Sequence, residues 1–372
     1  MRDDDEPDSV STRLAGHIRQ AIVEAGGWLS FERFMALALY APGLGYYARD
    51  DRQFGTLPGS GSDFVTAPEL SPLFGRALAR QLAQLLDASG TDEVWEFGAG
   101  SGALAGQLLE ALGERVRRYT IVDLSGALAA RQRRTLACFG AERVHWASAL
   151  PTAIDGVIVG NEVLDAMPVQ LIVFDGARWH ERGVAVTGGA ALAWRDRPTD
   201  ARPPVETTAF AGGIVVTELH RQANAFVATI AERLRRGAAI FIDYGFPEAE
   251  YYHPQRVGGT LMCHRGHRAD TDPLADVGRK DISAHVDFSA VALAAQDAGC
   301  DVLGYTSQAR FLIDCGLIDD LRDADPRTVA PAQKLLNEHE MGELFKVIAF
   351  ARGLPPGFEA IGFTRGDRTH TL

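Results

Sequence analysis

Residues 94–109 read VWEFGAGSGALAGQLL, and the fold prediction rests on this stretch. Apolar residues typical of a buried strand come first, a turn with three glycines follows, and the last residues have helical spacing. The glycines Gly98, Gly100 and Gly102 form the pattern G-x-G-x-G. Glycine adopts backbone angles that other residues avoid and lets a ligand approach the main chain. The pattern predicts a nucleotide-binding turn, and a tight turn without a ligand is the alternative.

The charge beside this turn indicates which nucleotide it binds. A dinucleotide turn has the pattern G-x-G-x-x-G and holds a pyrophosphate at the helix N-terminus. Here the third glycine comes one position early, and Glu96 stands two residues before the first. A carboxylate at that place would repel a pyrophosphate and attract an ammonium group. S-adenosylmethionine (SAM) carries an α-amine, beside a carboxylate that a helix N-terminus can receive. We therefore expect SAM, and a nicotinamide oxidoreductase is disfavoured.

Short apolar segments alternate with segments of helical spacing along the middle of the chain. This alternation is typical of a parallel sheet that helices cover on both faces. The sequence therefore predicts a doubly wound α/β fold. The expected strands are residues 93–97, 118–123, 143–146, 156–160 and 238–244, and the expected helices are residues 76–86, 103–112 and 126–139.

Other segments fall outside this alternation. Residues 10–39 predict two helices, and residues 40–75 form a long loop rich in Gly, Pro and aromatic residues. So long an irregular segment is usually functional or disordered, and its aromatic residues argue against disorder. We expect an antiparallel insertion at residues 169–216 and a loop insertion at residues 247–288. The predicted domains are residues 1–87 with the helices and a lid loop, residues 88–352 with the SAM-binding sheet and both insertions, and a C-terminal tail at residues 353–372.

Polar or aromatic residues stand at the ends of three expected strands. Asp123 lies where an acid that accepts both ribose hydroxyls should lie in a βαβ unit; a helix cap is the alternative. Leu124, directly after it, is expected to contact the cofactor as well. Trp146 offers a flat wall for adenine, but a core position explains it nearly as well. Asp243 and Tyr244 end a later strand and are weak evidence alone.

Asn161, Glu162 and Asp165 follow the fourth strand, in the segment NEVLDAMPV. Ligands in open α/β sheets bind at the carboxyl ends of the strands. If residues 162–166 form a helical turn, Glu162 and Asp165 share one face. Two carboxylates suit a cationic acceptor such as a guanidinium, whose proton must leave during or after methyl transfer. The alternative is that Asn161 and Glu162 cap a following helix while Asp165 is solvated.

With these residues the sequence resembles the MidA-type class I SAM-dependent methyltransferases. That family includes the mitochondrial arginine methyltransferase that acts in respiratory complex I assembly. The resemblance covers residues 13–351 and depends on several separate blocks in one order. The blocks are GYY (45–47), GSDFVTAPELSPLFG (61–75), EFGAGSG (96–102), GNEVLDAMPV (160–169), IDYG (242–245), GTLMCHRGH (259–267), DISAHVDF (281–288) and MGELFKV (341–347).

The resemblance implies a Rossmann-like, mostly parallel class I methyltransferase sheet and SAM as the cofactor. It implies that a protein substrate is methylated on arginine, with a respiratory complex I subunit as one candidate. A scaffold that binds SAM and acts as an assembly factor without catalysis is the alternative. By the resemblance, the SAM-binding residues are Glu96, Gly98, Gly100, Gly102 and Asp123, those beside the methyl group are Asn161, Glu162 and Asp165, and those of the covering loop are Thr66, Pro68 and Glu69.

Two further groups of residues have structural explanations that we prefer. Cys263, His264 and His267 lie close together, but a fourth zinc ligand is not evident, and we expect no metal. His285 and Asp287 could reach an acceptor pocket, although such residues more often tie a loop to the core through hydrogen bonds.

Composition narrows the partners and the compartment. The formal net charge is −12 and the isoelectric point is about 5.3, which disfavours nucleic acid and anionic lipid as partners. The N-terminus is acidic, and the sequence contains no apolar stretch of about 20 residues, so we expect no membrane insertion. The four cysteines lie far apart and include no C-x-x-C pair, as in reduced proteins. We therefore predict a cytoplasmic protein.

Overall fold

The central sheet confirms the predicted α/β fold in a computed structural model, which describes residues 6–48, 65–123, 126–206, 210, 213–266, 268–322 and 324–372. The strand order is β15-β16-β10-β5-β2-β3-β4, and β14 (Val286–Asp287) pairs in parallel with the last residues of β10. The strands from β4 to β10 are parallel, whereas β16 runs antiparallel to both of its neighbours. The strands are β2 (Glu93–Phe97), β3 (Arg118–Val122), β4 (Val144–Ala147), β5 (Ile154–Asn161), β10 (Leu234–Phe246), β15 (Asp301–Ser307) and β16 (Phe345–Arg352).

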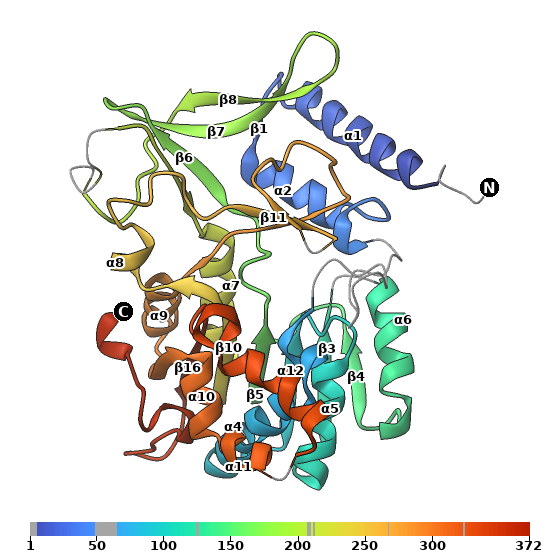
Figure 1. Ribbon diagram of the computed structural model, residues 1–372, viewed down its shortest axis with the longest axis vertical. Coiled ribbons are helices and arrows are strands. Elements are labelled where there is room, and N and C mark those ends of the chain that lie inside the picture. Colours follow the sequence, from blue (N-terminus) through green and yellow to red (C-terminus); the bar gives the residue numbers. More distant parts are fainter. Residues whose placement is uncertain are drawn as a thin grey trace.

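Helices cover both faces of this sheet, as the alternation predicts (Figure 1). Buried residues alternate between the faces along β10, so Ile240 belongs to the core under one helical layer and Phe241 to the core under the other. Among the helices that the structure describes, none is both long and apolar enough to cross a bilayer. One layer contains α4 (Pro72–Ser89), α5 (Ala103–Leu112), α10 (Gln308–Asp314), α11 (Leu317–Arg322) and α12 (Pro326–Leu336), and the other contains α7 (Arg221–Arg233) and α9 (Phe288–Asp297).

A second unit is built from the N-terminal helices and the insertions, and it lies above the central sheet in Figure 1. The predicted antiparallel insertion is confirmed, because its strands form a sheet of order β1-β7-β6-β9, with β8 on β7. The elements are α1 (Glu6–Glu24), β1 (Leu29–Ser30), α2 (Phe31–Tyr40), η1 (Tyr46–Ala48), β6 (Gln170–Phe174), β7 (Trp179–Val186), β8 (Leu192–Pro198) and β9 (Val215–Leu219).

The segment 247–288, expected to be a loop, contains short strands. β11 (Met262–Arg265) pairs antiparallel with both β12 (Arg268–Asp270) and β13 (Asp281–Ser283). Each strand is too short to show an alternating pattern among so many Gly, His and Asp residues. The segment also packs on the N-terminal helices, since Cys263 and Ile282 are buried in the same core as residues of α1 and α2. It therefore forms a fixed wall of the second unit.

The last residues of the chain pack back onto the central domain. The side chain of Asp367 accepts a hydrogen bond from the Tyr305 amide (3.0 Å). Phe363 is 6% exposed and contacts Phe311 of α10 with a centroid distance of 5.4 Å. Residues 353–372 therefore pack on β15 and α10, at the side of the central domain opposite β4 (Figure 1).

Candidate active site

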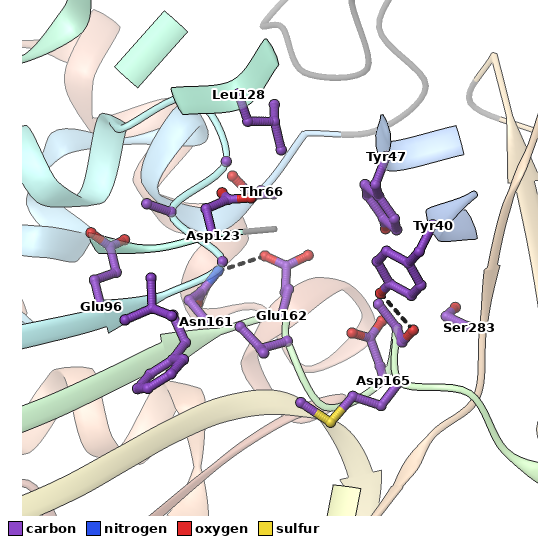
Figure 2. A pocket seen from close by; sticks show the side chains of 18 of the residues that line it. Tyr40, Tyr47, Thr66, Glu96, Asp123, Leu128, Asn161, Glu162, Asp165 and Ser283 are labelled. Carbon is purple, nitrogen blue, oxygen red and sulfur yellow. Dashed lines mark hydrogen bonds between the residues drawn. The ribbon is translucent and has the colours of Figure 1, made fainter. Parts of the chain in front are cut away.

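A cavity of about 780 Å³ opens at the carboxyl ends of the parallel strands, between the sheet and the second unit. Its size lies within the usual range of small-molecule sites. Figure 2 shows Glu162 in the middle of this cavity, with Asp123 on one side of it and Tyr40 on the other. The predicted site residues that line the cavity are Thr66, Pro68, Glu96, Gly98, Gly100, Asp123, Asn161, Glu162 and Asp165.

The glycine turn has the backbone that its pattern predicts. Gly98, Gly100 and Gly102 all have positive φ, at 64°, 51° and 83°. A Cβ atom on Gly98 would lie 2.9 Å from Val163 Cγ2, closer than packed atoms tolerate. Gly98 and Gly100 line the cavity, whereas Gly102 occupies the N-cap position of α5. The first two glycines thus expose main chain to a ligand, and the third starts the helix.

Glu96 lies at the inner wall of the cavity and is only 2% exposed. The Tyr119 hydroxyl donates a 2.7 Å hydrogen bond to its carboxyl. Burial raises the pKa of Glu96 to about 8, although the bond from Tyr119 opposes this shift. A cationic group in the cavity would favour the ionised carboxylate, so Glu96 suits an amine.

Gln132 of α6 (Gly126–Thr135) connects three predicted features, and sequence analysis missed it. Its amide nitrogen donates to Asp123 Oδ2 (2.8 Å) and to the carbonyl of Gly100 (3.1 Å). Its amide oxygen accepts a hydrogen bond from the Trp146 indole (3.0 Å). Gln132 is fully buried and therefore orients Asp123 against the glycine turn. The only sequence signal for this role is that Gln132 lies in the expected helix that follows Asp123.

Trp146 does not line the cavity, contrary to its expected place beside adenine. Its ring packs under the guanidinium of Arg133, 4.0 Å from the ring centroid, while its N–H is taken by Gln132. The side chains of Arg133 and Gln132 therefore cover the Trp146 ring. Ser148 and Leu150, which follow β4, line the cavity there instead. Leu124 lies outside the described residues.

The described end of the loop 40–75 places Thr66 and Pro68 on the cavity wall, at α3 (Ala67–Leu70). The carbonyl of Pro68 accepts a 2.6 Å hydrogen bond from Gln107 of α5, which fixes α3 beside the glycine turn. Glu69 does not line the cavity, and burial raises the pKa of its carboxyl while a bond from the Ser101 side chain opposes the shift. Residues 49–64 of the expected lid lie outside the described residues.

Residues 162–167, which follow β5, form a turn rather than a helix, so the expected helical turn and the alternative helix cap are both wrong. Glu162 has a φ of 54°, unusual for a residue with a side chain, and its N–H donates to the carbonyl of Ile242 (2.9 Å). The side-chain amide of Asn161 donates a 2.9 Å hydrogen bond to the Glu162 carboxyl. Asn161 therefore orients the Glu162 side chain within the cavity.

Asp243 is the physical reason for this turn. Its Oδ2 accepts hydrogen bonds from the amides of three consecutive residues, Val163 (3.1 Å), Leu164 (2.8 Å) and Asp165 (3.3 Å). These amides would otherwise need helical partners. Asp243 is 1% exposed and does not line the cavity, so its role is to shape the turn, whereas Tyr244 beside it does line the cavity.

The cavity concentrates acidic groups. Burial raises the pKa of Glu162 to about 8. Burial also raises the pKa of Asp165 well above its ordinary value, and the nearby Asp243 and Asp281 add to the effect by repulsion. Among the residues that the structure describes, those lining the cavity include no lysine or arginine, and burial lowers the pKa of His264, which favours its neutral form. The cavity therefore favours the binding of a ligand that carries a positive charge.

Sequence analysis missed one whole wall of the cavity. Four of the residues in this wall belong to the motifs GYY, CHRGH and DISAHVDF, but these motifs gave no sign that the residues line the cavity. Contacts between distant parts of the chain bring the wall residues together. The wall residues are Tyr40, Tyr47, His264, Asp281 and Ser283.

Neither His285 nor Asp287 is among the described residues that line the cavity, and the hydrogen-bond explanation is confirmed only for the Asp287 side chain, because His285 Nδ1 is buried without a hydrogen-bond partner. The amide of His285 donates to Thr260 Oγ1 (3.0 Å), and the Asp287 side chain caps α9 by accepting the Ala290 amide (3.1 Å). Cys263 is buried in the core, and His267 lies outside the described residues. In the part of the chain that the structure describes, no three His, Cys, Asp or Glu residues are arranged to hold a metal ion.

The fold and the cavity define a Rossmann-like α/β protein with a ligand site at the carboxyl ends of its strands. Residues 77–306 match the family described as "Putative S-adenosyl-L-methionine-dependent methyltransferase", and the chain belongs to this family. Membership confirms the resemblance and the SAM prediction at the level of the family.

Named relatives and solved structures agree with this membership. The mitochondrial protein arginine methyltransferase NDUFAF7 of Danio rerio is 26% identical over 91% of this chain and 86% of its own length. The Caenorhabditis elegans homolog is 24% identical over 85% of this chain and 80% of its own. A crystal structure from Burkholderia thailandensis bound to S-adenosyl-homocysteine has 50% identity and a TM-score of 0.93, with both chains fully covered.

The residues around the glycine turn fit SAM. Gly98 leaves room for main-chain contact where a side chain would clash, and Glu96 offers a carboxyl to an amine. Asp123 is held by Gln132 at the end of β3, where ribose hydroxyls are bound in βαβ units. Glu96 and Asp123 lie on the same side of Glu162 (Figure 2).

Proposed function

We propose that this SAM-dependent methyltransferase methylates an arginine side chain of a protein substrate. The observation that carries the proposal is the pair Glu162 and Asp165, in a cavity whose described lining supplies no positive side chain. Buried acids without a cation are costly, so the cavity gains most from an acceptor that brings one. Guanidinium is the side-chain cation whose fork of donors two carboxylates can grip.

We assign the two sides of the cavity to the two reactants. Glu96, Gly98, Gly100 and Asp123 would hold SAM, with Thr66 and Pro68 against it. Glu162 and Asp165 would hold the acceptor at the other side. SAM supplies an activated methyl group bound to a positively charged sulfur.

The chain's own residues then have three tasks. Glu162 and Asp165 orient one guanidinium nitrogen in line with the methyl carbon, since alignment is the main requirement of a displacement. The nitrogen–carbon bond forms as the sulfur–carbon bond breaks, and a carboxylate takes the proton that the nitrogen loses. Exclusion of water from the bound site would strengthen the grip of the carboxylates on the cation.

The names of the relatives support arginine as the acceptor, since several are called protein arginine methyltransferases at about 25% identity over most of the chain. The family resemblance makes a respiratory complex subunit the first acceptor to test. We propose that the reaction takes place in the cytoplasm, the compartment that the sequence predicts.

The test uses an extract from cells that lack this protein. Purified protein and methyl-labelled SAM are added, beside the Asp165→Ala variant, and labelled proteins are identified by mass spectrometry. The proposal expects one or a few proteins with methylarginine, absent with the variant. If both proteins bind S-adenosyl-homocysteine equally and neither adds label, the non-catalytic scaffold replaces the proposal.

A further inference from the structure

Strand β13 forms part of the cavity wall that sequence analysis missed, and its polar side chains face the cavity. Along β13, Asp281 and Ser283 line the cavity, whereas Ile282 between them is 1% exposed in the core of the second unit. Alternate residues of a strand face opposite sides, which explains this division. His264 of β11 is the direct partner of Asp281 across the small sheet and also lines the cavity.

Two tyrosines complete this wall from the N-terminal segment. The rings of Tyr40 and Tyr47 stack with a centroid distance of 5.7 Å and an interplanar angle of 21°. The Tyr47 hydroxyl donates a 2.8 Å hydrogen bond to Asp281 Oδ1, which also accepts the amide of Ile282 at 2.9 Å. The carboxyl is therefore fixed beside two aromatic rings.

The wall is joined to the turn that carries Asp165. The Tyr40 hydroxyl donates to the carbonyl of Ala166 (2.8 Å), and the amide of Ala284 donates to the carbonyl of Asp165 (3.0 Å). In Figure 2 the Tyr40 ring and the Asp165 carboxyl lie next to each other, and Ser283 is farther from Glu162. Asp165 and Asp281 thus belong to segments that hydrogen bonds join at this wall.

We propose that Tyr40, Tyr47 and Asp281 form the subsite that recognises the acceptor side chain and selects a planar guanidinium over an ammonium group. This inference rests on the proposed function, and it names the residues that would make the enzyme specific for arginine. A guanidinium can lie against an aromatic ring while its in-plane N–H groups reach the carboxylates of Asp165 and Asp281. An ammonium is compact and strongly hydrated, so it cannot use ring and carboxylates together.

The test measures binding rather than turnover. The full-length protein, saturated with S-adenosyl-homocysteine, is titrated with N-acetyl-argininamide, N-acetyl-lysinamide and the neutral N-acetyl-citrullinamide, and affinity is read by NMR. We expect the arginine probe to bind at least about tenfold more tightly than either other probe. Equal affinity for the arginine and lysine probes would overturn the proposal.

Two variants locate the effect. Asp281→Asn is expected to weaken the arginine probe about tenfold, and Tyr47→Leu, which removes the ring and its hydroxyl, by a similar factor. Affinity for S-adenosyl-homocysteine should stay within about twofold in both, since the wall lies on the acceptor side. Asp276→Asn is the matched control, because Asp276 lies in the same segment and pairs only with exposed Arg265 among the ion pairs described. Unchanged arginine affinity in either folded variant would contradict the subsite.

This experiment can fail separately from the proposed function. If the arginine probe binds as expected but the cell extract gains no methylarginine, the subsite stands and the proposed reaction fails. If methylarginine forms equally with the wild type and Asp281→Asn, the reaction stands and the subsite is wrong.

Discussion

Glu162 combines an unfavourable backbone conformation with a half-buried carboxyl whose pKa is raised. Its φ of 54° belongs to the left-handed region, where a residue with a side chain costs about 1–3 kcal/mol. The conformation persists because its own amide and the three that follow find fixed acceptors on β10. Strain of this kind is concentrated at functional sites, where it positions a side chain that an ordinary turn would not.

Replacing Glu162 should therefore separate stability from activity. We expect Glu162→Gly to unfold at a melting temperature equal to or higher than that of the wild type, because glycine removes both the strain and a half-buried acid. Methyl transfer should fall at least about 100-fold in Glu162→Gly and in the isosteric Glu162→Gln. Differential scanning calorimetry and label transfer measure the two effects.

The control for this prediction is Asp276→Gly. Asp276 has a similar φ of 52° but is exposed, so its replacement should relieve strain without changing methyl transfer. A Glu162→Gly variant that melts several degrees lower, or that keeps its activity, would refute the interpretation of Glu162.

Gly98 should be intolerant of any side chain. In Gly98→Ala the new methyl group would meet Val163 at 2.9 Å with φ at 64°, so the turn must shift. We expect affinity for S-adenosyl-homocysteine, measured by calorimetry, to fall at least about tenfold. Gly188→Ala is the control, since a Cβ atom there meets nothing within 4 Å. Normal affinity in Gly98→Ala would show that the turn does not contact the cofactor.

At the scale of elements, the strand–turn–helix unit was predictable from the sequence, whereas the distant residues whose hydrogen bonds hold the site together were not. Residues 93–97 and 103–112 were predicted with the observed bounds, because local apolar patterns determine them. The turn after β5 was predicted wrongly as helical, because the acceptor of its amides, Asp243, is 80 residues away in sequence. The wall of tyrosines likewise depends on contacts between α2 and β13, which no local pattern reveals.

Gln132 of α6 makes hydrogen bonds of this kind. In Gln132→Ala the Asp123 carboxyl, the Gly100 carbonyl and the Trp146 indole each lose a hydrogen bond. Bonds to charged groups contribute about 1.5–3 kcal/mol, so affinity for S-adenosyl-homocysteine should fall about tenfold or more. Gln20→Ala, at an exposed position of α1, is the control. Unchanged binding in Gln132→Ala would remove Asp123 from the proposed cofactor contacts.

At the scale of the whole molecule, the cavity makes stability depend on pH. Burial raises the pKa of Glu96 and Glu162 to about 8 and that of Asp243 to about 7 in the folded protein. Their unfolded values are near 4, so the folded state binds more protons between about pH 4 and pH 8. The stabilisation is fully present below the unfolded pKa and is lost as pH rises through the folded pKa.

The melting temperature of the ligand-free protein should therefore decrease between pH 5.5 and pH 9. Glu96→Gln cannot titrate at this position, so its melting temperature should decrease less over the same interval. A fluorescence-monitored thermal scan of both proteins at several pH values measures the difference. Equal slopes in the two proteins would mean that Glu96 is not buried as the structure shows.

The central claim is that one cavity transfers a methyl group from SAM to a guanidinium nitrogen held by Glu162 and Asp165. The most direct measurement quantifies S-adenosyl-homocysteine and methylarginine in the same reaction, with the acceptor protein identified from the cell extract. With the wild type, the account predicts one S-adenosyl-homocysteine for each methyl group found on arginine, and with Asp165→Asn it predicts neither product above background. Methyl label on a residue other than arginine, or methylarginine formed equally by the variant, would contradict it.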